Sequence, residues 1–257
     1  METDELKGNK PIVAFTLDFE TGGLNCVNCA CTQIALHAVR IDTFETVDRY
    51  VKYILPYKKQ EKGVKAKKVL KTKYEQEDAP MMQYEEKALT YSDISMDTLE
   101  SKGEEISQVA KEVIDFIKRN TASKARNEKP FLIGQNIGFD IGFMQQLMAY
   151  GKMEKEWEQC MRGQKDFYGN FQPLYVDTIV MGQLAFSQIP EMNSYKLDIM
   201  SEKLGIELDD AHDADADVTA TTNVLMSLTK RMRSEGSGEG SDMELTKKEK
   251  TRAHFKI

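Results

Sequence analysis

The chain has 257 residues, of which 40% are hydrophobic, and its 35 basic and 42 acidic side chains give a net charge of −7. This length is enough for one large or two small domains with a buried core, and the hydrophobic content excludes wholesale disorder. The negative charge argues against nucleic-acid binding by phosphate neutralisation alone, so divalent metals and a local basic patch would have to offset the repulsion of a polyanionic ligand.

The first elements that we expect are three strands. Residues 11–17 are apolar and rich in strand formers, which predicts a central buried strand with Asp18 at its C-terminal end. Residues 32–40 and 46–54 alternate in polarity, which is typical of a meander with one covered face. His37 lies in the second strand, where a lone histidine is far more often structural than catalytic, and we assign it no role.

Three of the four cysteines, Cys26, Cys29 and Cys31, lie between the first two of these strands, whereas Cys160 is far along the chain. Four cysteines so unevenly placed do not suit a disulfide framework. A zinc site needs four ligands, and three histidines supply no second pair at a suitable spacing. We therefore favour a loop of reduced thiols over a metal site.

A lysine-rich insertion interrupts the pattern at about residues 58–87. Eight lysines lie between Lys58 and Lys73, and Glu75, Glu77 and Asp78 follow them. An unstructured loop rarely exceeds about 12 residues, so this segment is an added element, a solvated excursion or a basic arm that grips phosphates. The closeness of the acidic residues favours the solvated excursion.

The rest of the chain alternates between helical and strand patterns. Apolar residues at helical spacing and glycines at helix ends predict its elements. Helices are expected at residues 104–120, 139–150, 178–187, 194–204 and 213–232, and short strands at residues 131–134 and 174–177.

The expected domain covers residues 11–233, preceded by an extension of residues 1–10 and followed by a flexible charged tail of residues 234–257. The charged N-terminus lacks the apolar core of a signal peptide, and no apolar stretch approaches the length that spans a bilayer. We therefore expect a soluble, cytoplasmic protein with no membrane partner.

Two carboxylates lie close together near the end of the first expected strand. Asp18 and Glu20 are two positions apart on an extended chain, so both side chains project from the same face. Neighbouring carboxylates without a counter-ion repel and raise each other's pKa, and a metal ion removes that penalty. Divalent cations such as Mg²⁺ prefer oxygen ligands, so these two acids are a plausible half-site. Thr21 and Gly22 follow in a turn whose backbone N–H groups could approach a nucleotide closely.

A further acid follows the strand expected at residues 131–134. Asn136 and Asp140, taken alone, suit an ordinary turn residue and a first-turn helix acid. Ligands of open α/β sheets bind at the C-terminal ends of strands, however, so Phe139 and Asp140 are expected to face the same sheet edge as Asp18.

The third acidic segment carries His212 and, after it, Asp213, Asp215 and Asp217. Asp213 suits a helix cap or a first-turn acid, and Asp217 lies one turn further along the helix. Asp215 is expected on the opposite, solvent-facing side. A histidine, with an unperturbed pKa of about 6.5, suits deprotonation of a metal-bound water near neutral pH.

Together these segments read, in chain order, Asp18-x-Glu20, Asn136-x-x-Phe139-Asp140 and His212-x-x-x-x-Asp217. The ordered set resembles the three motifs of the DEDDh (DnaQ-like) 3'-5' exonucleases, typified by the proofreading epsilon subunit of DNA polymerase III. The resemblance runs from about residue 11 to residue 233 and includes Ser194-Tyr-Lys-Leu197. It implies an α/β, ribonuclease H-like fold with a five-stranded mixed sheet flanked by helices.

The resemblance also implies a site with two Mg²⁺ or Mn²⁺ ions. Two such ions about 4 Å apart can hold the attacking water and the leaving oxygen of a phosphodiester. Asp18, Glu20 and Asp217 would hold the ion that carries the water, and Asp18 would bridge to the second ion. Asp140 would reach that second ion directly or through water, and His212 would be the general base.

The implied function is release of nucleoside 5'-monophosphates from the 3' end of DNA, as single strands or frayed ends. RNA ends, as in oligoribonuclease or ribonuclease T, are the alternative, and a non-catalytic nucleic-acid-binding module is the rival from another class. A proofreading role would require a DNA polymerase or another replication or repair protein as partner. Substrate contacts are expected from Phe19, Thr21, Gly22, Leu24, Asn136 and Phe139.

The chain departs from the family pattern at three places. Gly22 stands where a second threonine is frequent, the loop of residues 25–31 carries cysteines, and the lysine-rich insertion is extra. These departures bear on substrate preference more than on the chemistry.

Overall fold

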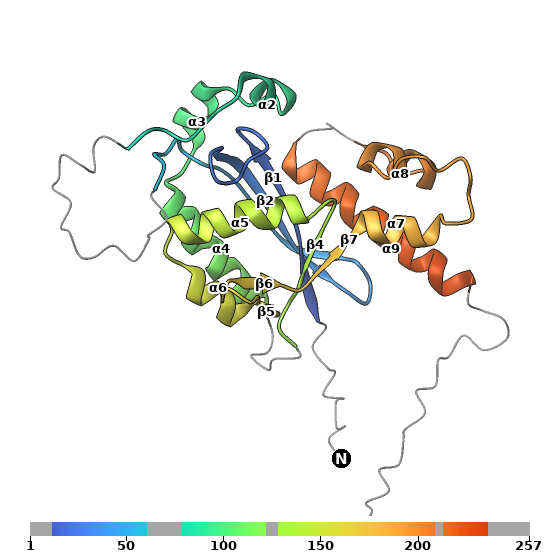
Figure 1. Ribbon diagram of the computed structural model, residues 1–257. Coiled ribbons are helices and arrows are strands. Elements are labelled where there is room, and N and C mark those ends of the chain that lie inside the picture. Colours follow the sequence, from blue (N-terminus) through green and yellow to red (C-terminus); the bar gives the residue numbers. More distant parts are fainter. Residues whose placement is uncertain (1–11, 61–78, 122–127, 209–212, 236–257) are drawn as a thin grey trace, which may run out of the picture.

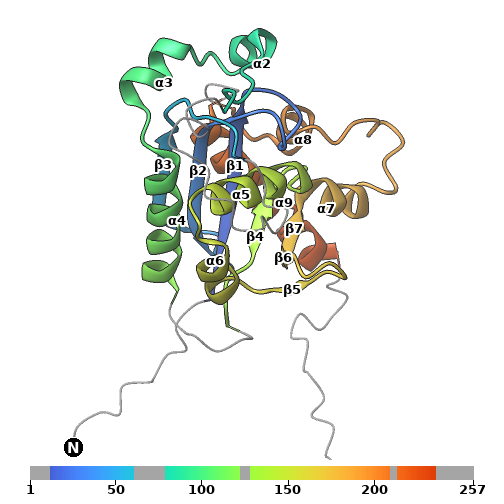
Figure 2. The same ribbon diagram turned by 60° about the vertical axis from the view of Figure 1, so that its left-hand side comes forward.

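The computed structural model describes residues 12–60, 79–121, 128–208 and 213–235. Within them, a five-stranded mixed sheet with the order β3-β2-β1-β4-β7 carries helices on both faces (Figures 1 and 2). The α/β architecture expected from the sequence, a five-stranded mixed sheet flanked by helices, is confirmed.

The strands of the large sheet are β1 (Val13–Thr21), β2 (Cys31–Arg40), β3 (Thr46–Tyr53), β4 (Leu132–Gly134) and β7 (Tyr175–Asp177). The helices are α2 (Glu86–Tyr91), α3 (Met96–Lys102), α4 (Ile106–Asn120), α5 (Gly138–Tyr150), α6 (Glu154–Cys160), α7 (Thr178–Ala185), α8 (Leu197–Leu204) and α9 (Ala214–Glu235). A separate hairpin is formed by β5 (Gly163–Lys165) and β6 (Phe171–Pro173).

The central strand β1 is longer than the sequence predicts. Its pairing with the antiparallel β2 continues to Thr21 and Cys31, so Asp18 lies inside the strand and not at its end. On the other side β1 pairs in parallel with β4, over Phe15 and Thr16 only. The acidic half of β1 therefore extends beyond β4, at the sheet edge where α5 begins.

The expectation of a meander with one covered face is wrong for β2 and holds for β3. Every residue of β2 except Arg40 is buried, whereas exposed or half-buried positions dominate β3. The reason is that helices cover β2 on both faces. Helix α9 crosses β1 and β2 on one face, and α4 and α5 cover the other (Figure 2).

The larger core lies between the sheet and the α4–α5–α6 layer. Helix α4 buries an apolar stripe that includes Val113 and Phe116, and the Phe116 ring lies 5.7 Å from that of Phe15. Both rings are fully buried, and burial of each such side chain stabilises the fold by about 1.5–3 kcal/mol. This packing holds β1 rigidly beneath the helices.

Part of the expected insertion is well-formed structure. Residues 61–78, with most of its lysines, lie outside the described residues. Its last part, however, runs beside the β1–β2 loop, with a bridge between Gln83 and Cys29, and α2 begins at Glu86. Met82 is buried in the core and anchors this last part of the segment, so it is not a solvated excursion there, and the bounds of the insertion, about residues 58–87, stay a prediction.

The expected N-terminal extension and charged tail fall, except for residues 234–235, outside the described residues. No helix in the described ranges combines the length and apolar character needed to cross a membrane.

Candidate active site

Three carboxylates from two distant segments meet beside β1. Asp18 and Glu20 project from one face of the strand, and Asp217 reaches them from the first turn of α9. One carboxylate oxygen of each lies within 4.8 Å of the others. The structure thus brings together side chains that are about two hundred positions apart in the sequence.

Asp140 joins this site through the backbone of β1. It lies in the first turn of α5, is 3% exposed, and its Oδ1 accepts a hydrogen bond of 3.1 Å from the Phe19 N–H. Burial, and next the charge of Asp18, raise the pKa of Asp140 well above its usual value. The hydrogen bond fixes the start of α5 against the strand between the two acids.

The acidic cluster is electrostatically strained when no cation is bound. Burial, followed by the charges of Asp217 and Asp213, raises the pKa of Asp18 to about 7. Burial, followed by the charge of Asp18, raises the pKa of Glu20 to about 8. A cation between these groups would offset the repulsion and favour the ionised forms.

The donor set suits a hard divalent cation. All three groups offer carboxylate oxygen, the ligand that Mg²⁺ and Mn²⁺ prefer, and a handful of carboxylates suffices because such ions keep several waters. Among the described residues, no other group of three His, Cys, Asp or Glu side chains gathers in this way.

The cysteines next to the site are free thiols. Cys29 and Cys31 are buried, and the Cys31 thiol lies 3.3 Å from Gln146 Oε1. Burial raises the pKa of Cys31 to about 12, so this thiol stays protonated. The Gln146 amide donates to the carbonyl oxygens of Cys26 and Cys29, which ties the loop to α5.

The third acidic segment is described only from Asp213 onwards, and His212 lies outside the described residues. The Asp213 carboxylate accepts a hydrogen bond of 3.1 Å from Gln33 of β2. The prediction that Asp215 faces solvent is wrong. Its side chain is 35% exposed and contacts His37 and Arg49, because α9 lies along the sheet with this face turned inward.

The residues expected to contact substrate fall into two groups. Leu24, in the β1–β2 loop, is 85% exposed. Asn136 is also exposed and has a positive φ of 54°, and its backbone N–H donates a hydrogen bond to the Asp177 carboxylate. Phe139 is half-buried, with its ring 5.0 Å from that of Phe143. These three side chains have surface that a nucleotide could reach.

The other expected contacts are engaged within the protein. Phe19 is 4% exposed and belongs to the core, so its ring offers no stacking surface. The Thr21 hydroxyl donates to the Gly23 carbonyl at 2.9 Å. A Cβ on Gly22 would lie 2.5 Å from the Gln83 carbonyl oxygen, and the Gly22 carbonyl accepts from the Glu85 N–H at 2.7 Å. Gly22 thus permits the close approach of the segment that leads into α2.

Sequence reasoning missed Tyr91, at the end of α2. Its side chain is 67% exposed, and partial burial, followed by the charges of Asp217, Glu20 and Asp198, raises the pKa of its hydroxyl. The phenol therefore stands near the carboxylates. A tyrosine in a segment of unassigned structure gave no signal of this position.

A family model described as "Exonuclease" matches residues 15–225 of the chain. Comparison with curated protein sequences gave no match. Similar solved structures include Escherichia coli exonuclease I in complex with a dA16 oligonucleotide, at 19% identity and a TM-score of 0.58, covering 85% of this chain and 41% of that one.

Two further structures agree with this likeness. The zinc-bound form of the E. coli exonuclease I complex with single-stranded DNA has 18% identity and a TM-score of 0.61, covering 86% of this chain and 41% of that one. Exonuclease I from Methylocaldum szegediense has 17% identity and a TM-score of 0.60, covering 85% and 40%. The chain spans about two fifths of the length of these proteins, with which it shares the ribonuclease H-like fold.

Proposed function

Because this chain belongs to the exonuclease family, as a DEDDh 3'-5' exonuclease, we propose that it releases nucleoside 5'-monophosphates from the 3' end of DNA. The observation that carries the proposal is the gathering of Asp18, Glu20 and Asp217 into one oxygen-rich cluster. Three half-buried or buried acids that repel one another, with the pKa values of Asp18 and Glu20 raised, are costly to a fold, and a role in cation binding explains why the cluster exists.

The proposed mechanism divides the work among five residues. Two Mg²⁺ or Mn²⁺ ions, when bound, would neutralise the phosphate and favour ionisation of water and departure of the sugar oxygen. Asp18, Glu20 and Asp217, together with Asp140, would hold these ions. His212 would accept the proton of the attacking water, a role that suits its titration range.

Substrate would lie across the exposed surface next to the carboxylates. Leu24 and Phe139 offer apolar surface on which terminal bases could stack, and the backbone at Thr21 and Gly22 and the side chain of Asn136 offer polar contacts. Phe19 would contribute through its backbone position and not through its ring.

DNA is the favoured substrate because the solved relatives hold deoxyoligonucleotides, and single strands or frayed ends would fit the open site. RNA ends are the alternative. Assembly with a DNA polymerase or another replication or repair protein, the cytoplasmic location, and residues 11–233 as the domain boundaries remain predictions.

The test is a nuclease assay on a 5'-labelled single-stranded DNA with Mg²⁺ or Mn²⁺. Wild type should shorten the strand stepwise from its 3' end and release mononucleotides, while Asp18→Ala should be inactive. A matched RNA strand compares the two substrate classes, since preference for it would point to contacts with the 2'-hydroxyl. Equal activity of wild type and Asp18→Ala would refute the proposal.

A further inference from the structure

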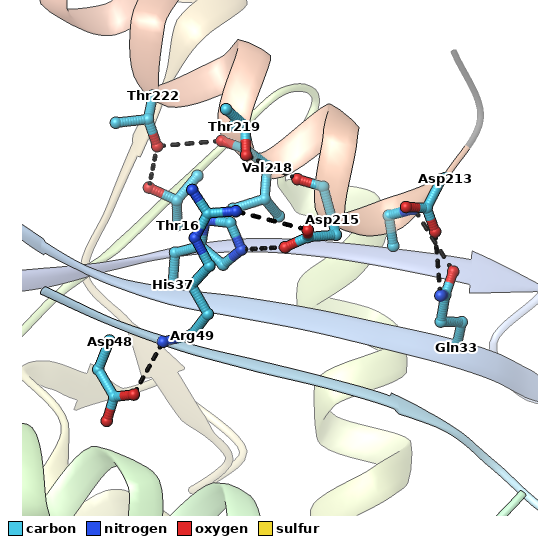
Figure 3. Close-up of polar contacts among 11 residues, drawn as sticks. Thr16, Gln33, His37, Asp48, Arg49, Asp213, Asp215, Val218, Thr219 and Thr222 are labelled. Carbon is cyan, nitrogen blue, oxygen red and sulfur yellow. Dashed lines mark hydrogen bonds and ion pairs between the residues drawn. The ribbon is translucent and has the colours of Figure 1, made fainter. Parts of the chain in front are cut away.

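Helix α9 lies on the sheet through polar contacts as well as apolar ones (Figure 3). His37 of β2 is fully buried, and its Nε2 lies 2.5 Å from Asp215 Oδ1 of α9. The other oxygen of Asp215 lies 3.5 Å from an Arg49 guanidinium nitrogen on β3. One carboxylate on the helix is therefore held by two neighbouring strands.

The state of the His37 ring follows from its surroundings. Its Nδ1 is buried and has no hydrogen-bond partner among the described residues, so a proton there would be unsatisfied. Burial lowers the pKa of His37, although the hydrogen bond to Asp215 opposes this shift. The ring is thus neutral, and its Nε2 donates a hydrogen bond to the Asp215 carboxylate.

The position of this contact along α9 matters because Asp215 lies two residues before Asp217. On one side of it, the Gln33 side chain binds both Asp213 and the Ala214 N–H, at 3.1 and 3.4 Å. Within the helix, the Asp217 N–H donates to the Asp213 carbonyl at 2.9 Å. The first turn of α9, which carries Asp217, is therefore tied to β2 at two points.

A second tie further along the helix provides a reference. The Thr222 hydroxyl, beyond Asp217, lies 3.0 Å from the Thr16 hydroxyl of β1 and is also buried (Figure 3). This contact holds the body of α9 and not its first turn. Both of its partners are buried hydroxyls, whereas the His37 contact joins a buried ring to a carboxylate that is 35% exposed.

We propose that His37, acting through Asp215, is a positioning residue. It sets how the first turn of α9 is rotated about the helix axis and how far it lies from the sheet, and so brings Asp217 to Asp18 and Glu20. A leucine at position 37 would fill much of the same volume but would leave the Asp215 carboxylate without its buried donor. The catalytic consequence rests on the proposed function, whereas the placement of the helix turn does not.

The experiment measures amide hydrogen exchange in α9 and Mn²⁺ binding by calorimetry in the intact protein. His37→Leu removes the donor, and His37→Gln supplies an amide donor of similar reach. Asp215→Ala removes the acceptor at a partly exposed site, so it tests the same contact if the buried substitution prevents folding. Thr222→Val is the matched control for loss of a buried hydrogen bond in the same helix.

Loss of a hydrogen bond to a charged group should speed exchange of the Asp217 amide at least about tenfold in His37→Leu and Asp215→Ala, and weaken Mn²⁺ binding severalfold. His37→Gln should restore much of the protection of the Asp217 amide from exchange and much of the Mn²⁺ affinity. Thr222→Val should lower the unfolding temperature while leaving Mn²⁺ affinity unchanged.

Wild-type exchange at Asp217 in both His37→Leu and Asp215→Ala overturns the inference, whether or not the protein cleaves DNA. Mn²⁺ affinity equal to that of wild type in both variants also overturns the inference. A wild-type protein that cleaves no DNA, with exchange that still depends on His37, would instead overturn the proposed function and leave the positioning of the helix supported.

Discussion

The substitution Asp18→Asn should stabilise the metal-free protein at alkaline pH while abolishing its activity. The pKa of Asp18 is about 7 in the folded protein and, as an ordinary aspartate, about 4 in the unfolded chain. Between these values the folded state holds a proton that the unfolded state lacks, so rising pH lowers the stability of the wild type. Above pH 7 the full penalty is present, and asparagine at this position removes it.

The pKa of Asp18 is about three higher in the folded protein than in the unfolded chain, which corresponds to a loss of at most about 4 kcal/mol in the free energy of unfolding. Asp18, Glu20 and Asp217 share the same repulsion, so removing one charge should recover about half of this, or about 2 kcal/mol. For a domain of this size, that is a rise of about 4–8 °C in the unfolding temperature. The gain should be smaller at pH 5, where Asp18 is already protonated in the folded protein.

The assay is thermal unfolding in EDTA at pH 5 and pH 8, repeated with Mg²⁺, which should stabilise wild type much more than Asp18→Asn. Asp48→Asn is the control: although burial opposes it, hydrogen bonds from Asn120 and Arg119 lower the pKa of Asp48, so this variant should gain no stability. The electrostatic reasoning would be refuted if Asp18→Asn and wild type had the same unfolding temperature at pH 8. It would also be refuted if the variant's gain in unfolding temperature were the same at pH 5 and pH 8.

His212→Ala should lower kcat by about 10²–10⁴-fold and keep Mn²⁺ affinity, as measured by calorimetry beside the nuclease assay; normal turnover would assign the base to another residue. Leu24→Ala should raise KM for single-stranded DNA severalfold at an unchanged unfolding temperature, because this exposed side chain contributes little to the core; an unchanged KM would remove Leu24 from the substrate surface. Gly22→Ala should cost about 1–3 kcal/mol in urea unfolding, since its Cβ would meet the Gln83 carbonyl oxygen; wild-type stability would show that the segment before α2 moves freely.

The sequence predicts those parts of the fold whose patterns are local. The apolar run of β1 and the helical spacing in α4 are strong signals, and both elements exist as predicted, although β1 continues to Thr21 and not only to residue 17. The short helices α2, α3 and α6 and the hairpin β5–β6 gave no such signal. Their residues are held by contacts with distant segments, as Trp157 of α6 is by the core, and periodicity does not report such contacts.

The same distinction applies to the candidate site. The order of the three motifs, through their resemblance to the DEDDh exonucleases, was enough to predict that Asp18, Glu20 and Asp217 gather in one place. Which face of α9 meets the sheet depends on packing, so the contact between Asp215 and His37 could not be read from the helix itself. The burial of Phe19 was missed for a similar reason, because alternation along a strand does not say which face is covered.

The central claim is that carboxylates of β1 and α9 form one cation site, and Mn²⁺ titration followed by calorimetry tests it most directly. Wild type should bind two ions per chain, and Asp217→Ala should lose saturable binding or weaken it by about tenfold or more while keeping its fold. Absence of saturable binding by wild type, or equal affinity in Asp217→Ala, would contradict the account.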